Sequence, residues 1–287
     1  MKILNIGASG LVGGSLYKKL SNKAYILGTY NQIKIDNFVK LDIVNKDDVM
    51  KVVSDFYPDI IFLTAALTNV DLCEENKELC WRINVQGTRN VVHAANKIGA
   101  KLIFFSSDYV FDGKSGPYSE EDKINPINNY GKSKIEAENI IKELSDYLII
   151  RTTVVYGNEL QCKNFASRTI KSLREGKTVK AVVDQISTPT YVGDLADKVI
   201  ILTKRKKKGI YNVAGPDLMS RYEFAKHIAN VFNLDENLIV PVTTLELRQK
   251  APRPLKAGLK TNKLYMELGL RTMSVIEGLE AMKNEQQ

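Results

Sequence analysis

Short apolar runs alternate with helical patterns through the first 150 residues of the chain. Several runs have the length of buried strands, namely residues 2–6, 24–29, 38–41, 59–63, 101–105 and 147–150. Helical patterns lie between them, at about residues 11–20, 45–57, 74–98 and 133–144. Strands separated by helices of this size predict parallel βαβ units, with helices on both faces of one sheet.

Local signals support these elements. Residues 60–63 and 102–105 contain only apolar side chains, which is typical of strands buried on both faces of a parallel sheet. Asn45 is a candidate helix N-cap, and Pro58 and Gly99 mark the ends of the helices that precede them.

After Arg151 the alternation of strand and helix patterns becomes less regular. Residues 164–175 and 221–232 have helical patterns, whereas 180–189 and 240–258 look irregular and contain several prolines. We therefore predict an α/β fold, a Rossmann-like doubly wound parallel sheet with a smaller, irregular C-terminal substrate-binding cap. The expected division is a dinucleotide-binding domain over 1–151, rejoined by about 190–215, and a mainly substrate-binding domain over 152–287.

Composition narrows the class of protein. The 287 residues are 44% hydrophobic and 26% charged, with no apolar run long enough for a membrane span and no signal-peptide pattern. Three cysteines without metal-ligand spacing favour a reduced, cytoplasmic setting and no metal site. The net charge is +8, but its densest run, 204–208, lacks aromatic neighbours and is interpreted as a solvated loop, not a nucleic-acid site.

A glycine-rich turn follows the first strand. Gly7, Gly10 and Gly13 have the spacing G-x-x-G-x-x-G at the mouth of the first helix. Glycine lets the backbone approach a pyrophosphate, and the helix N-terminus adds unpaired N–H groups and a positive dipole end. We expect Ser9, Leu11 and Val12 to share this cofactor contact.

The end of the second strand informs the choice of cofactor. Residues 28–31 contain no acid to bind an adenosine ribose and no arginine to bind a 2′-phosphate. NADP(H) is weakly preferred over NAD(H), with Lys34 as the nearby cation. Asp42 has two interpretations, an adenine contact or a helix-entry acid.

A proton-transfer group is suggested further along. Tyr130 and Lys134 are four residues apart at a helix start, so they share one helical face. An ammonium beside a phenol stabilises its phenolate and lowers its pKa. Ser106 and Ser107 end a buried strand, where a hydroxyl can bond the carbonyl that Tyr130 protonates. Asn84 is either a relay residue or a structural hydrogen-bonding group.

Together these residues resemble the dTDP-4-dehydrorhamnose reductase family, within the extended short-chain dehydrogenases. The resemblance covers residues 1 to about 264. Its most specific motifs are Ser-Asp-Tyr-Val-Phe-Asp-Gly and Asp-Gln-x-x-x-Pro-Thr, and the carrying stretches are 7–10, 65–71, 106–113, 130–134, 150–152, 184–190 and 253–254.

The resemblance implies NAD(P)H-dependent reduction of the C4 ketone of a dTDP-6-deoxy-hexulose to dTDP-L-rhamnose. Tyr130 then donates the proton, Lys134 holds the cofactor ribose and Ser107 polarises the carbonyl. Further cofactor contacts are implied at Ile43, Ala65 and Ala66. Substrate contacts are implied on the sugar side at Thr68, Val70 and Tyr109, and on the nucleotide side at Asn164 and Arg253. A nucleotide sugar is the expected partner, and a homodimer is a possible assembly.

Two departures from the family pattern stand out. Ser107 replaces the usual Thr and keeps the hydroxyl, whereas Val154 replaces the usual Trp before Val-Tyr-Gly, which puts the exact sugar in question. Two alternatives stay open: a non-catalytic NADP-binding regulatory subunit like the methionine adenosyltransferase β-subunit, and a nucleotide-sugar epimerase or dehydratase.

Overall fold

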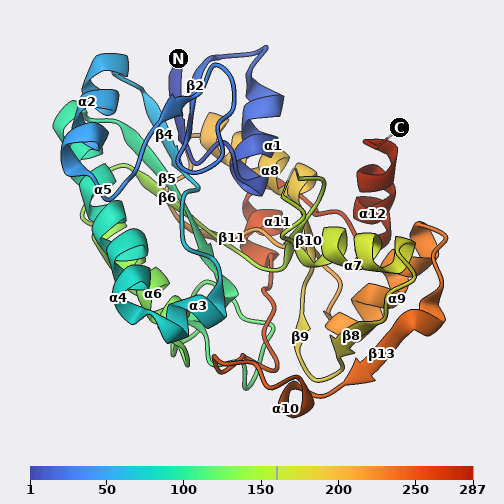
Figure 1. The fold of residues 1–287 in the computed structure, drawn as a ribbon. Helices are drawn as coiled ribbons and strands as arrows, with labels where there is room; N and C mark the ends of the chain where they lie inside the picture. Colours follow the sequence, from blue (N-terminus) through green and yellow to red (C-terminus); the bar gives the residue numbers. More distant parts are fainter. Residues whose placement is uncertain (160, 287) are drawn as a thin grey trace.

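A seven-stranded parallel sheet forms the centre of the molecule (Figure 1). The computed structural model describes residues 1–159 and 161–286. The strands lie in the order β11-β6-β5-β4-β1-β2-β3. Their bounds are Lys2–Ile6 for β1, Tyr25–Tyr30 for β2, Val39–Lys40 for β3, Ile60–Leu63 for β4, Lys101–Ser107 for β5, Tyr147–Thr152 for β6 and Gly209–Asn212 for β11. The strand order reverses between β1 and β4, which is where doubly wound sheets bind ligands. The predicted fold class is confirmed.

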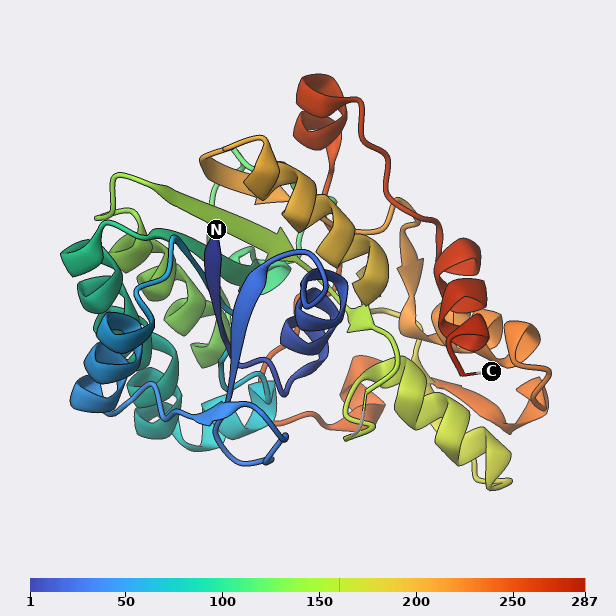
Figure 2. The ribbon, with the colours of Figure 1, turned by 90° about the horizontal axis from the view of Figure 1, so that it is seen from above.

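Helices cover both faces of this sheet (Figures 1 and 2). One face packs against α2 (Lys46–Phe56), α5 (Gly87–Ile98) and α6 (Asn129–Ile141). The other face packs against α1 (Leu11–Leu20), α8 (Val192–Lys204) and α11 (Asn262–Leu268). Each layer buries its own apolar cluster, so the sheet is apolar on both sides, as its uninterrupted hydrophobic strands require.

The predicted helix over 74–98 is wrong in its first half. The chain there forms α3 (Val70–Glu75), α4 (Lys77–Trp81) and a π-helical turn, η1 (Arg82–Gln86), before α5. Asn76 has non-helical dihedral angles, and its side chain accepts a hydrogen bond from the Leu79 N–H at 2.9 Å. The asparagine therefore ends one helix and caps the next. Gly99 ends α5 in the left-handed conformation, as expected.

Helix α6 begins four residues earlier than the sequence pattern predicts. Asn128 caps it, because its side chain accepts the Gly131 N–H at 2.8 Å. This start places Tyr130 in the first turn of the helix and Lys134 one turn later.

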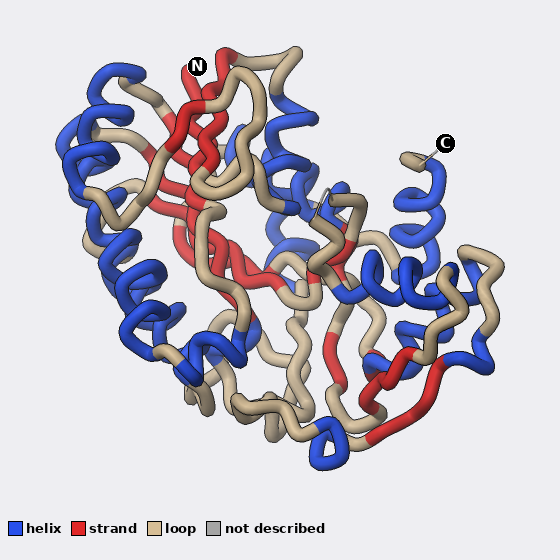
Figure 3. Tube along the Cα trace, viewed as in Figure 1, coloured by secondary structure: helices blue, strands red, loops and turns tan. Residues whose placement is uncertain are grey.

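The rest of the chain forms a smaller lobe beside the carboxyl ends of the strands (Figure 3). Three two-stranded sheets occur in it, β10-β7, β12-β9 and β13-β8. Its strands are β7 (Val155–Tyr156), β8 (Val179–Val182), β9 (Ile186–Ser187), β10 (Thr190–Tyr191), β12 (Met219–Ser220) and β13 (Ile239–Val242). Its helices are α7 (Phe165–Arg174), α9 (Arg221–Val231), α10 (Thr244–Leu247) and α12 (Val275–Asn284), and short 3₁₀ turns lie at η2 (Asp108–Val110) and η3 (Glu236–Leu238). The segments expected to be irregular, 180–189 and 240–258, thus contain short paired strands.

Strand β11 returns the chain to the large sheet beside β6. Within residues 1–159 and 161–286, no helix has both the length and the apolar character needed to cross a bilayer.

Candidate active site

Ser107 is the last residue of β5, at the edge of the sheet where parallel strands end. It is 8% exposed, and its Oγ accepts the Tyr109 N–H at 3.2 Å, which begins the turn η2. The neighbouring Ser106 hydroxyl points elsewhere, donating to Glu138 Oε1 at 2.6 Å. Of the two candidate serines, only Ser107 has its hydroxyl beside the proposed proton donor.

Glu138 connects α6 to the sheet. Arg151 on β6 donates to it through Nε at 3.0 Å and Nη2 at 2.7 Å, so the pair is bidentate. Both side chains are almost fully buried, which makes the geometry well defined. The pair fixes the rotation of α6 and hence the direction of the side chains one and two turns earlier.

Tyr130 and Lys134 are both turned inward from α6. Tyr130 is 9% exposed, its ring meets Tyr109 edge-on at 5.8 Å between centroids, and its phenol lies close enough to Ser107 for that hydroxyl to lower the phenol's pKa. The Lys134 ammonium lies 4.1 Å from the centroid of the Phe104 ring on β5. The structure therefore places Ser107 at the end of β5 beside Tyr130, with Lys134 one helical turn further along α6.

Burial decides the protonation of these groups. Burial raises the pKa of the Tyr130 phenol, and the contact with Ser107 opposes this only in part. The depression of this pKa that we expected from Lys134 is therefore outweighed by desolvation. A raised pKa keeps the phenol protonated at neutral pH, which is the form a proton donor needs.

Burial also lowers the pKa of Lys134 to about 8, although the Glu138 carboxylate raises it. An unfolded lysine keeps an ordinary pKa near 10.5, so between these two pH values the unfolded chain binds more protons than the folded one. The free energy of unfolding should consequently rise with pH across that window. Below about pH 8 the ammonium is charged in both states, so the folded chain keeps the whole unfavourable free energy of burying it.

Lys134→Met is expected to stabilise the fold at neutral pH by up to about 3 kcal/mol. Methionine removes the buried charge and has a side chain of similar length to lysine. The gain should shrink as pH rises from 8 towards 10.5. Denaturant unfolding at several pH values measures this. Lys132→Met, an exposed lysine on the same helix, is the matched control and should show no such pH dependence. A pH-independent difference for Lys134→Met would contradict the assignment.

The glycine turn has the shape of a pyrophosphate cradle. Gly7 has φ +94°, and a Cβ on Gly13 would lie 2.3 Å from the Gly7 carbonyl oxygen, so both positions need glycine for close packing. Gly10 is different, because a Cβ there would meet only the Gly7 oxygen at 3.4 Å and would otherwise occupy open space. Gly10 caps α1 without a side-chain hydrogen bond, and no acid lies in the first turn. The donors of this helix end, with Ser9, Leu11 and Val12 around them, thus fit a dinucleotide.

The loops that follow β1, β2 and β4 contain the residues expected to bind the adenosine part of a cofactor. Thr29 Oγ1 accepts the Gly7 N–H at 3.2 Å, and the Ala65 N–H donates to Ile6 O at 3.1 Å, so these loops are directly joined. Ala66 follows in the same loop and is half-buried. Asp42 is exposed and accepts the Val44 N–H at 3.0 Å, as a helix-entry acid does. The Ile43 side chain is buried against α5.

The expected sugar-side residues separate into two groups. Val70 and Tyr109 pack against the buried cluster of Cys73, Cys80 and Tyr130, which places them beside the proton donor. Thr68 is exposed on the loop that joins β4 to α3.

The two expected nucleotide-side residues behave differently. Arg253 is paired through Nη2 with Asp71 on α3 at 2.8 Å. The Asn164 side chain caps α7, accepting the Ser167 N–H at 3.1 Å and donating to Gly157 O at 2.9 Å. In this structure the Asn164 amide is hydrogen-bonded to the backbone of Gly157 and Ser167, and so supports the start of α7.

Asn84 is a structural residue. Its Oδ1 accepts the Leu67 N–H at 2.8 Å, while its Nδ2 donates to Leu67 O at 3.1 Å and to Ser133 Oγ at 3.0 Å. The amide therefore holds the β4–α3 loop against α6, from within a π-helical turn of the kind often found at functional sites.

Asp108 was missed as a functional candidate, although it directly follows the strand-end serines. It is 2% exposed and accepts Thr153 Oγ1 at 2.6 Å and Ser107 Oγ at 3.1 Å. Burial raises the pKa of its carboxyl group. In this structure Asp108 therefore holds the hydroxyl proton of Ser107.

A small cavity begins beside Asp108 and extends into the smaller lobe. Its lining includes Tyr109, Val154, Gln185 and Arg221. Val154 has φ +45°, a left-handed conformation that is unusual for a β-branched residue and typical of functional sites. The strained backbone of Val154 makes this wall of the cavity a candidate part of the functional site.

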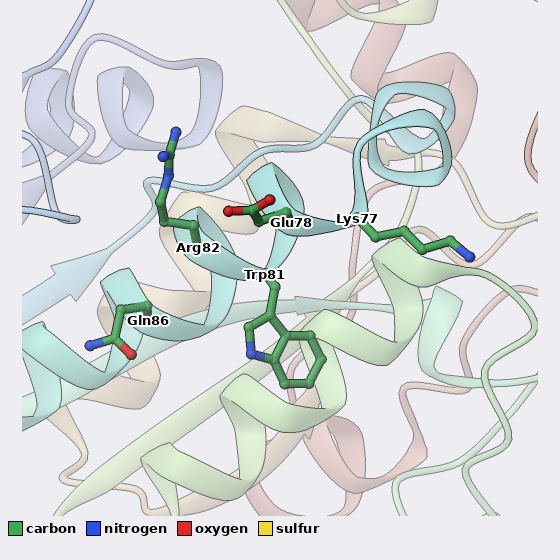
Figure 4. Close-up of a pocket in the computed structure, with 5 residues that line it drawn as sticks. All are labelled: Lys77, Glu78, Trp81, Arg82 and Gln86. Carbon is green, nitrogen blue, oxygen red and sulfur yellow. The ribbon is translucent and has the colours of Figure 1, made fainter.

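A second hollow lies on the outer surface of α4 and η1, lined by Lys77, Glu78, Trp81, Arg82 and Gln86 (Figure 4). Trp81 is 49% exposed, and none of the proton-transfer residues contributes to this surface. In the described part of the chain, no three His, Cys, Asp or Glu side chains gather as a metal site would need.

Comparison with known proteins gives consistent results. Residues 1–287 match the RmlD substrate binding domain family. The chain is 35% identical to dTDP-4-dehydrorhamnose reductase from Aggregatibacter actinomycetemcomitans, covering 94% of each protein. It is 34% identical to methionine adenosyltransferase 2 subunit beta from Xenopus laevis, covering 94% of this chain and 84% of that protein. Its fold is similar to the crystal structure of dTDP-4-dehydrorhamnose reductase from Bacillus anthracis in complex with NADP, with a TM-score of 0.91, 36% identity and 99% of each chain covered.

Proposed function

The chain belongs to the RmlD substrate binding domain family, that of the dTDP-4-dehydrorhamnose reductases, and on this premise we propose that it reduces the C4 ketone of a nucleotide-activated deoxy sugar. It is an NAD(P)H-dependent oxidoreductase. The observation that carries the proposal is the convergence of Ser107, Tyr130 and Lys134 at the strand edge that also bears the glycine turn.

Each group has a defined task. The backbone around Gly10 would hold the pyrophosphate of a bound dinucleotide, and Lys134 and Tyr130 would hold its nicotinamide ribose; the cofactor would supply the hydride. When a ketone binds, Ser107 would turn its hydroxyl proton from Asp108 to the ketone oxygen and so polarise the carbonyl. Tyr130, kept protonated by burial, would give its proton to the same oxygen, which balances the hydride that the cofactor would supply to the carbon.

The substrate we propose is dTDP-4-dehydrorhamnose, with dTDP-L-rhamnose as the product. The similarity to the named reductases supports this choice. We also propose that NADP(H) is preferred over NAD(H), since residues 28–31 at the end of β2 carry no acid to repel a 2′-phosphate and Lys34 is the nearby cation.

Nicotinamide absorbance followed with dTDP-4-keto-6-deoxy sugars generated in situ tests this function. We expect stoichiometric oxidation of NADPH that requires the sugar, with kcat/KM higher for NADPH than for NADH. Tightly co-purifying NAD with no net NADPH consumption would contradict the proposal and favour an epimerase or dehydratase.

A regulatory role is the second candidate, favoured by the 34% identity to a methionine adenosyltransferase β-subunit. That role predicts capture of an adenosyltransferase in a pull-down and no sugar-dependent turnover. The intact set of Ser107, Tyr130 and Lys134 favours the reductase, because docking alone does not require it.

A further inference from the structure

Two cysteines, Cys73 on α3 and Cys80 on α4, lie in one buried cluster with Tyr130. Both are free thiols, and their side chains are 0% and 1% exposed. Asn76 breaks the helix between them, so that α3 and α4 both turn a cysteine towards α6. The proton transfer proposed for Tyr130 uses neither sulfur atom.

The surroundings of Cys80 favour its thiolate form. Its Sγ lies 3.5 Å from Ser133 Oγ and accepts a hydrogen bond from Asn84 Nδ2 at 3.6 Å. The Cys73 thiol is the largest influence that lowers the pKa of Cys80, and the Lys134 ammonium acts in the same direction against burial. The same contact, together with burial, raises the pKa of Cys73, so the shared proton stays there. Because the thiolate is the reactive form of a cysteine, Cys80 is the nucleophile of the pair.

A short chain of contacts joins the pair to the proton donor. Ser133 Oγ, which Cys80 touches, donates to the backbone carbonyl oxygen of Tyr130 at 2.7 Å. A covalent bond brings two sulfur atoms much closer together than non-bonded contact allows. A disulfide between Cys73 and Cys80 would therefore draw Cys80 away from Ser133. A packed interior transmits such a shift to the residues it touches, and Tyr130 is one of them.

We propose that Cys73 and Cys80 form a site of oxidation by hydrogen peroxide, and that their disulfide slows the reduction carried out at Tyr130. The Cys80 thiolate attacks one peroxide oxygen, the O–O bond breaks and hydroxide leaves, which gives a sulfenic acid on Cys80. The Cys73 thiol then attacks the Cys80 sulfur, and water leaves as the S–S bond forms. Hydroxide takes up the proton released when Cys80 ionised. Two thiols and one peroxide thus give one disulfide and two waters, with two electrons passing from sulfur to peroxide.

The helices that cover the pair are short enough to admit so small an oxidant. Helix α3 has six residues and α4 has five, and helices of this length depend on tertiary packing for their stability. Local opening of such segments needs much less free energy than global unfolding. Only the effect on turnover rests on the proposed function, because the disulfide itself depends on the two thiols alone.

Peptide mapping of the full chain tests the pairing. The protein carries Cys162→Ala, which removes the exposed third thiol, and is treated with millimolar hydrogen peroxide, alkylated under denaturing conditions and digested with trypsin. Trypsin cuts after Lys77, between the two cysteines, so only a disulfide holds the two peptides together. We expect joined peptides that dithiothreitol separates. Cys80→Ala in the same background is the matched control and should give none, and Cys73→Ala serves if that variant does not fold.

Turnover of the same preparations tests the consequence. Peroxide should lower kcat of the Cys162→Ala protein by at least about tenfold, since a misplacement of about 1 Å near a reacting group can cost about 100-fold. Dithiothreitol should restore the rate. The Cys80→Ala protein should keep its own rate through the same treatment.

Three results would overturn the inference. One is the absence of joined peptides, whether Cys80 stays a thiol or ends as a sulfinic acid. Another is a disulfide that leaves kcat within about twofold, which would contradict the effect on Tyr130. A third is an equal loss of kcat in Cys80→Ala, which would place the damage at another residue. If the untreated chain did not oxidise NADPH with the sugar, the proposed function would fail, while peptide mapping would still decide whether the disulfide forms.

Discussion

Tyr130→Phe is expected to lower kcat by about 1,000-fold, the usual contribution of a positioned general acid, while the Kd for NADPH stays within about twofold. The change removes one oxygen from a side chain that is 9% exposed, so the ring keeps its edge-on packing against Tyr109. Steady-state kinetics and a cofactor titration on the same preparation measure both quantities.

A surface tyrosine provides the control. Tyr57→Phe deletes the same atom from a side chain that is 60% exposed and far from the strand-edge site, and it should leave kcat unchanged. If Tyr130→Phe retained more than about a tenth of wild-type kcat, the phenol would not be the proton donor, since even weak general acids contribute about 100-fold.

Where strand and helix patterns were strong, the sequence was sufficient to predict the sheet. The all-apolar strands at 60–63 and 102–105 are central and buried on both faces, because helices pack on each side of the sheet. Asn45 caps α2 as expected, with its side chain accepting the Asp47 and Asp48 N–H groups. These features depend on neighbours in sequence or on a simple period, and both can be seen in the chain alone.

Interactions between distant residues could not be predicted in this way. Ser106 and Ser107 are equivalent in sequence, but only the buried pair of Glu138 and Arg151 determines which hydroxyl is left for chemistry. The raised pKa of Tyr130 likewise reflects burial, a property of the whole fold, which outweighs the effect expected of an ammonium one turn away.

The cavity shows the same limit. Val154 attracted attention only as a departure from a family pattern, whereas its positive φ is a feature of the folded chain.

Gly10→Val is expected to weaken NADPH binding by at least about 100-fold, because the isopropyl group would separate the pyrophosphate from two or more charge-assisted donors at the start of α1. The fold itself should survive. Gly10 has φ −89° and ψ 171°, which valine adopts readily, and a Cβ there meets only the Gly7 oxygen at 3.4 Å. Fluorescence titration with NADPH and a thermal unfolding curve separate the two effects.

Two neighbouring glycines make this test specific. Gly14→Ala also places its Cβ 3.4 Å from a carbonyl oxygen, that of Ala8, but inside α1, so it should bind NADPH normally. Gly13→Ala should instead damage the fold, since its Cβ would lie 2.3 Å from Gly7 O, and low stability is then the cause of any lost binding. A stable Gly10→Val protein with normal NADPH affinity would remove the pyrophosphate from this turn. The dinucleotide would then have to bind elsewhere, although the sheet reverses its strand order next to this loop.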